Sequence, residues 1–110
     1  MSRFCKARRL IKKQDFNHVF NKAKKQVYGS LTLLYKPNTL PYARLGFAIS
    51  KRYVNHAVVR NKIRRIIKES FRLQELLPAY DVVILMNQPC DKQKIQYIHQ
   101  NIEKLWQKLK

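Results

Sequence analysis

In the stretch 57–72, AVVRNKIRRIIKESFR, apolar and polar positions follow a regular period. Its apolar residues recur at helical spacing, so in a helix they would share one continuous arc. These residues are Val59, Ile63, Ile66, Ile67 and Phe71. The adjoining arc holds Arg60, Asn61, Arg64, Arg65, Lys68 and Arg72, with Glu69 at its edge. We therefore predict an amphipathic helix that packs on a core with one face and presents positive charge on the other.

The ends of this helix are predicted from capping and proline signals. Asn55 is a candidate N-cap, because its side chain can accept a hydrogen bond from the first helical turn. Pro78 restricts the residue before it to extended conformations, so the helix should end near residues 76–77.

Three further stretches have strand patterns. Residues 27–36 and 42–50 alternate apolar and polar positions around a proline-bracketed turn, KPNTLP, and we predict that they pair as antiparallel strands. Residues 81–87, DVVILMN, form a continuous apolar run, which is typical of a strand buried on both faces.

Two more helices complete the predicted order. Residues 14–23 form a short helix by the spacing of Phe16, Val19, Phe20 and Ala23, and residues 95–109 form a last helix that Asp91 can cap. Phe16 and Phe20 lie one turn apart and suit either a core or a platform for a ligand. The order helix, two or three strands, helix, strand, helix predicts a single α+β domain over residues 1–110, with helices packed on a small mixed sheet.

The charge of the chain indicates that this domain is a binding protein. The 110 residues hold 24 Lys and Arg against 6 Asp and Glu, a formal net charge of +18. Residues 1–68 hold 18 of the cations and only one acid, whereas residues 69–110 hold six cations and five acids. So many positive charges repel one another in the folded state. They therefore indicate a polyanionic partner that docks on the first two-thirds of the fold. A basic chain without a specific anion is the plainer alternative.

The N-terminus and the cysteines add context. Residues 1–13 carry six cations and few apolar anchors, so they form either an arm along a phosphate backbone or a frayed terminus. Cys5 and Cys90 form no disulfide framework, and no apolar signal region follows the basic start, so we expect a reducing, cytoplasmic setting. No run approaches the ~20 apolar residues that span a bilayer, and we expect no membrane partner.

Catalysis by the protein itself is poorly supported by its acids and histidines. A two-metal nuclease needs convergent carboxylates, and the six acids form no cluster in sequence. No nucleophile lies at a sequence spacing typical of catalysis from any of the three histidines, so we predict surface or loop positions for His18, His56 and His99. A protein nuclease that uses His56 with Glu69 stays open as an alternative. Neither a glycine-rich phosphate loop nor metal-ligand spacing is present.

The cationic arc itself suits a nucleic acid. Arg60, Arg64 and Lys68 recur every four residues, about 6 Å apart along a helix axis, and this interval is close to phosphate spacing along a strand. Arginine binds phosphate through two parallel hydrogen bonds, and Asn61 adds a neutral donor and acceptor. A solvated helix face and a membrane-surface helix are the alternatives, although the apolar face is needed by the core.

The run VVRNKIRRIIKESFR, preceded by SKR and followed by LPAYDVVIL, resembles the bacterial ribonuclease P protein subunit. It is similar to the RNR signature of that family, roughly R-N-x-[IV]-[KR]-R-x-x-[KR]-E. RLIKKQDFNHVF near the N-terminus resembles the first helix of the family, and the match runs through nearly the whole chain in order.

The resemblance implies a fold of order αβββαβα with a left-handed β-α-β crossover, a hand that general rules disfavour. It implies a protein that joins a catalytic RNA, with one copy of each, and assists removal of the 5′ leader from precursor tRNA. Phosphodiester hydrolysis would then be carried out by the RNA with Mg²⁺. The sequence assigns no cofactor to the protein itself, and the Mg²⁺ is a requirement of the complete ribonucleoprotein.

The resemblance also assigns site residues. Lys51, Arg52, Arg60, Asn61, Arg64, Arg65 and Lys68 would contact the catalytic RNA, and Phe16, Phe20 and Tyr35 would line the cleft that holds the single-stranded leader. Two positions depart from the family pattern: VNHA stands where a glycine-containing loop is common, and Lys62 replaces a frequent arginine. A general RNA-binding or ribosomal protein without a leader cleft remains the main alternative.

Overall fold

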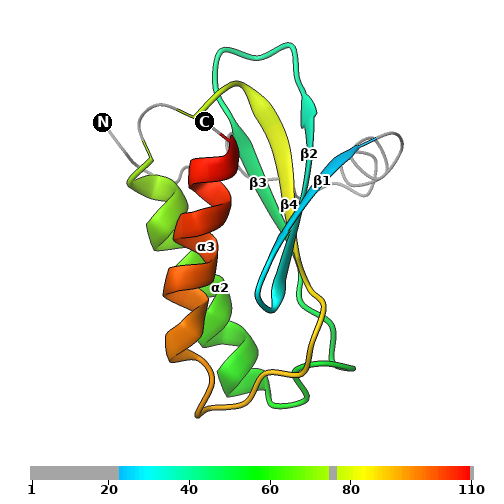
Figure 1. Ribbon diagram of the computed structural model, residues 1–110, viewed down its shortest axis with the longest axis vertical. Coiled ribbons are helices and arrows are strands. Elements are labelled where there is room, and N and C mark those ends of the chain that lie inside the picture. Colours follow the sequence, from blue (N-terminus) through cyan, green and yellow to red (C-terminus); the bar gives the residue numbers. More distant parts are fainter. Residues whose placement is uncertain (1–22, 75–76, 110) are drawn as a thin grey trace.

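The computed structural model describes residues 23–74 and 77–109, which form one four-stranded sheet and two helices on one side of it (Figure 1). Along the chain the elements are β1 (Lys24–Tyr28), β2 (Leu31–Pro37), β3 (Arg44–Ala48), α2 (Ala57–Arg72), β4 (Tyr80–Met86) and α3 (Gln96–Leu109). The α+β class and the mixed sheet are thus confirmed. The predicted helix at 14–23 and the arm at 1–13 lie outside the described residues, apart from Ala23.

A tight turn divides the predicted strand 27–36 into two. Tyr28 pairs with Leu31 across a two-residue turn, and Gly29 adopts a φ of 60°, which glycine accepts at low cost. A Cβ at Gly29 would also lie 2.5 Å from the side chain of Asn101 on α3. The hairpin of β1 and β2 is therefore closed by the one residue type that fits both the backbone and its neighbour.

The sheet order is β1-β2-β4-β3, so the predicted pairing of residues 27–36 with 42–50 is wrong. β4 lies between β2 and β3, antiparallel to β2 and parallel to β3. The reason is burial, because Val82, Val83 and Ile84 are fully buried and a strand that is apolar on both faces belongs at the centre of a sheet. α2 connects the parallel strands β3 and β4; the left hand of this crossover stays a prediction.

The main core lies between the sheet and the two helices. Leu33, Leu45 and Ile84 come from three neighbouring strands and are at most 1% exposed, and they belong to one cluster with Ile63 and Ile102 of the helices. On the opposite face Val83 centres a smaller cluster with Ala23, Leu34, Ala48 and Leu85. Alternate residues of each strand therefore face either the main core under the helices or the smaller cluster on the other side of the sheet.

Both predicted ends of the long helix are wrong. His56, not Asn55, is the N-cap residue of α2, and no side chain caps the first turn. The helix ends at Arg72 rather than near residues 76–77, with Leu73 as its C-cap. There the side chain of Gln74 donates to the Ser70 carbonyl at 3.2 Å, so a side chain occupies an acceptor that a further helical turn would use.

α2 and α3 are joined by a buried polar contact. The indole Nε1 of Trp106 donates to Ser70 Oγ at 2.7 Å, and Ser70 Oγ donates to Glu103 Oε1 at 2.8 Å. The rings of Trp106 and Phe71 pack with centroids 5.8 Å apart. Since Trp106 is fully buried, its N–H needs this partner, and the contact fixes how the two helices face each other.

Candidate nucleic-acid interface

Five predicted RNA-binding residues share one face of α2, which we call the cationic face: Arg60, Asn61, Arg64, Arg65 and Lys68. Arg60, Arg64 and Lys68 are half-buried along the border with the core, and Asn61 and Arg65 are exposed farther out. The helix is held by its buried stripe, so this face has a fixed position on the domain. The structure thus brings these predicted residues together.

The inner row of the cationic face is held in place by its neighbours. Arg60 Nη1 donates to the carbonyl oxygen of Val54 at 2.8 Å. Arg64 Nη1 donates to Asn61 Oδ1 at 3.2 Å, and Lys68 Nζ lies 6.0 Å from the centre of the Phe47 ring on β3. Fewer rotamers have to be fixed when an anion arrives, so part of the entropic cost of binding is met in the free protein.

Carboxylates that could compete for these cations are engaged elsewhere. Within residues 23–74 and 77–109, Glu69 pairs with Arg72 at 2.7 Å, and Asp81 pairs with Arg44 at 2.7 Å. Glu103 accepts from Ser70, as described above, and Asp91 Oδ1 accepts the amides of Gln93 and Lys94. In the same ranges no ion pair joins a carboxylate to the cationic face. Its charge is consequently available to a polyanion.

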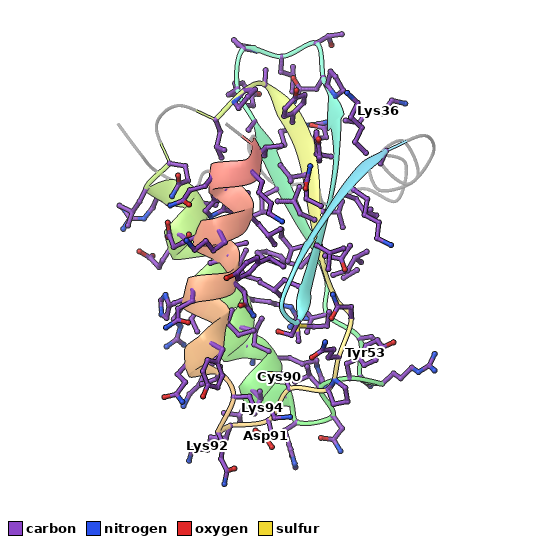
Figure 2. The ribbon with its side chains drawn as sticks, viewed as in Figure 1. Lys36, Tyr53, Cys90, Asp91, Lys92 and Lys94 are labelled. Atoms are coloured by element: carbon purple, nitrogen blue, oxygen red, sulfur yellow. The ribbon has the colours of Figure 1, made fainter. Side chains whose placement is uncertain are left out.

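The loop before α2 adds Lys51 and Arg52, which are both exposed. The Arg52 amide donates to Ser50 Oγ at 3.0 Å, and its guanidinium carbon lies 5.6 Å from the centre of the Tyr53 ring. The amide of Cys90 donates to the Tyr53 carbonyl at 3.0 Å, which ties this loop to the one that precedes α3 (Figure 2). The basic loop is therefore anchored beside the start of α2.

Cys90 is a free, buried thiol at this junction. Burial is the main cause that raises its pKa above the ordinary value, and the nearby charge of Asp91 acts in the same direction. The thiol stays protonated near neutral pH and serves as a small apolar group.

Of the three predicted leader-binding residues, Tyr35 lies within the described part of the chain. Phe16 and Phe20 lie outside the described residues. Tyr35 is half-buried on the face of the sheet that α2 and α3 cover, and its ring centre lies 5.1 Å from that of Tyr80. Its neighbour Leu34 points to the opposite face, in the cluster around Val83. Whether Tyr35 shares a cleft with the two phenylalanines stays a prediction.

Sequence patterns missed the supports of the cationic face. The Val54 carbonyl carries no signal in sequence, because any residue offers one. Phe47 is visible as an apolar strand position, yet its contact with Lys68 depends on β3 lying at the sheet edge next to α2.

The alternative of catalysis by His56 and Glu69 fails on distance. They lie 13 positions apart on one helix, about 20 Å along its axis. Among the described residues no three His, Cys, Asp or Glu side chains group in a way that could hold a metal ion. Nor does that part of the chain contain a helix with the length and apolar character to span a membrane.

The fold and this surface define a class: a small α+β domain with a mixed four-stranded sheet that presents a fixed cationic helix face. Comparison with known proteins identifies the family. The ribonuclease P family model matches residues 4–110. The chain is 43% identical to the ribonuclease P protein component of Legionella pneumophila (strain Corby) over 99% of this chain and 95% of that protein. It is 39% identical to that of Chromohalobacter salexigens, over 96% and 84%.

The fold agrees with the sequence match. The Staphylococcus aureus RNase P protein superposes with a TM-score of 0.85 and 28% identity, covering 96% of this chain and 97% of that one. The chain therefore belongs to the ribonuclease P protein component family, as its RNR-like helix predicted. Membership implies an RNA partner and a place in tRNA processing.

Proposed function

We propose that the chain binds the catalytic RNA of ribonuclease P through the cationic face and the loop before it. The observation that carries this proposal is the fixed row of cations on α2 with no described carboxylate paired to it. Arg60, Arg64 and Arg65 would bind phosphates in pairs of parallel hydrogen bonds, and Asn61 would bind a base edge or a 2′-hydroxyl. Lys51 and Arg52 extend the same contact.

The second part of the proposal concerns the substrate. The leader of precursor tRNA is single-stranded, and stacking on aromatic side chains contributes about 1–3 kcal/mol per base. Phe16, Phe20 and Tyr35 are the proposed leader-binding residues. Because mature tRNA has no leader, this contact would favour precursor over product and so assist turnover.

Hydrolysis itself is assigned to the RNA subunit with Mg²⁺. This protein's own residues would bind and orient: the cationic face lowers repulsion between phosphates that the folded RNA brings together, and the leader contact places the substrate strand. Neither step needs a proton transfer by the protein.

Reconstitution tests the proposal. The full-length chain is mixed with a ribonuclease P RNA at low Mg²⁺, and cleavage of precursor tRNA is measured with and without protein. Stimulated cleavage at the mature 5′ end is expected. The absence of stimulation would contradict the proposal, and cleavage by the protein alone would assign the chemistry to this chain.

Leader recognition needs a separate test with matched variants. Phe20→Ala should weaken binding of leader-bearing precursor more than binding of mature tRNA. Tyr35→Ala and Leu34→Ala change neighbouring positions on opposite faces of β2, so comparing them shows which face of the sheet meets the leader. Equal losses for precursor and mature tRNA in all three variants would favour a general RNA-binding protein.

A further inference from the structure

A second surface, on the far side of the helix pair from the cationic face, has the composition of a stacking platform. β1 and β3 are the two edges of the sheet. The cationic face borders β3 through the contact of Lys68 with Phe47, whereas α3 packs against β1 (Figure 1). With strands about 4.8 Å apart, three spacings place these edges about 14 Å from each other.

The exposed aromatic residues gather on this second surface. Tyr28 on β1 is 39% exposed and Tyr97 on α3 is 52% exposed, and every other Tyr, Phe or Trp in residues 23–74 and 77–109 is at least half-buried. Exposed aromatic rings beside cations are the groups on which nucleic-acid bases stack. These two rings are therefore the candidate contacts of this surface.

Lysines lie around both rings. Lys108 Nζ lies 5.5 Å from the centre of the Tyr28 ring and donates to the Val27 carbonyl at 3.2 Å, which holds the ammonium group beside the ring. Lys104 lies one turn before Lys108 and is exposed. Lys94 lies just before the start of α3 (Figure 2), near Tyr97. We call Tyr28, Lys94, Tyr97, Lys104 and Lys108 the α3–β1 surface.

Two hollows flank the point where the β1–β2 turn meets α3. One, about 350 Å³ in volume, is lined by Gly29, Lys94, Tyr97 and Asn101 among others. The other, about 360 Å³, is lined by Tyr28 and Lys104 among others. Asn101 Nδ2 donates to Ser30 Oγ at 3.2 Å, so the β1–β2 turn is fixed to α3 beside the first hollow. Glu103 borders the second hollow, but its carboxylate accepts the Ser70 hydroxyl.

We propose that the α3–β1 surface binds a single-stranded RNA segment, with bases stacked on Tyr28 and Tyr97 and phosphates paired with Lys94, Lys104 and Lys108. Aromatic rings interleaved with cations are the composition that single-strand binders use, and such contacts tolerate many sequences. The three lysines of this surface favour a polyanion over a second copy of this chain, which would bring like charges together. Since the surface uses none of the residues of the proposed function, one protein could hold two RNA segments at once.

The first test uses a fluorescent ten-nucleotide oligouridine and the full-length chain, with affinity read by anisotropy. Tyr97→Ala should weaken binding about tenfold or more, the equivalent of one lost stacking contact. Tyr97→Phe keeps the ring and should bind like the unmodified chain. Leu73→Ala, at the exposed C-cap position that follows α2, is the matched control and should also leave affinity unchanged. An unchanged affinity in Tyr97→Ala would overturn the proposal.

The second test adds a ribonuclease P RNA. If the α3–β1 surface is separate, the oligouridine still binds the ribonucleoprotein, and a 4-thiouridine version crosslinks to residues of β1 and α3. Complete displacement by the catalytic RNA, or crosslinks confined to α2, would overturn the proposal. Failure of the proposed function appears instead as no stimulation of precursor cleavage, while the oligouridine result for the free chain stands on its own.

Discussion

α2 and α3 share an inner pattern but differ in their outer surfaces. Each buries five side chains against the same core. On the remaining positions α2 carries six Lys and Arg with one acid, whereas α3 carries two Lys with one acid. The stability of both helices comes from the buried stripe, because packing rather than intrinsic propensity holds helices of this length. The outer positions are therefore free to specialise: α2 in charge, and α3 in exposed aromatic and polar groups.

The two helices also begin differently. At the start of α2 no side chain caps the first turn, which contains no acid. Before α3, Asp91 Oδ1 accepts the amides of Gln93 and Lys94 at 3.0 and 3.1 Å. Asp91 thus caps the turn that leads into α3 rather than the first turn of the helix, which begins at Gln96, so the predicted cap is displaced from the helix itself. A cap stabilises a helix, and an acid at this end neutralises its partial positive charge. The first turn of α2 has neither feature within its own sequence, although Asp91 lines the same hollow as His56, so what distinguishes this end is its uncapped N–H groups.

The largest expected effect comes from the contact that the helices share. Trp106→Ala removes a fully buried ring that packs on Phe71 and hydrogen-bonds to Ser70. Burial of this size predicts a loss of about 3–5 kcal/mol in the free energy of unfolding, measured by urea denaturation. Both helices should lose structure in the same transition.

Trp106→Phe is the matched control for this change. It keeps an aromatic ring and removes the N–H donor, so its cost should be smaller than that of alanine. If Trp106→Ala melted α3 while α2 stayed folded, for example by amide hydrogen exchange, the helices would not depend on a common core and the comparison between them would lose its basis.

A smaller effect separates the outer surfaces. Arg64→Ala should weaken binding of the catalytic RNA by about 1.5–3 kcal/mol, the range for hydrogen bonds to charged groups. The slope of log affinity against log salt should fall by roughly one unit, because one phosphate contact is lost. Lys104→Ala removes the same charge from the α3–β1 surface, which is proposed to bind a different RNA segment, so it should leave the slope for the catalytic RNA unchanged. Equal slopes in both variants would mean that net charge, not the cationic face, drives binding.

The sequence predicted those elements whose pattern is local. The 3.6-residue period of α2 located its core face and its cationic face, and the continuous apolar run around Val83 predicted a strand buried on both faces. The RNR-like motif also identified the family, because a specific order of Arg, Asn and Lys carries more information than charge alone.

The rest depended on long-range contacts. β2 and β3 follow one another in sequence, yet β4 inserts between them because only β4 is apolar on both faces. Likewise, the side chain of Gln74 donates to the Ser70 carbonyl just beyond the end of α2, a contact that no periodicity reveals. Gly29-Ser30 is a dipeptide typical of a hairpin turn. The apolar alternation on both sides of it favoured a single strand, so the turn between β1 and β2 was not predicted.

The smallest effect concerns the uncapped start of α2. His56→Asp places a side-chain acceptor and a negative charge at the N-cap, so it should raise the free energy of unfolding by about 0.5–2 kcal/mol, measured by urea denaturation. The same charge lies beside Lys51 and Arg52 and should weaken catalytic RNA binding. Stability and affinity should thus move in opposite directions.

His56→Ser separates the cap from the charge. Its hydroxyl can accept the same hydrogen bond, so it should also stabilise the fold, but without repelling phosphate. If serine and aspartate lowered RNA affinity equally, the loss would come from an altered loop path before α2. If neither lowered it, the open helix start would have no part in RNA binding. A loss with aspartate alone would indicate that the uncapped N-terminal end of α2 binds phosphate.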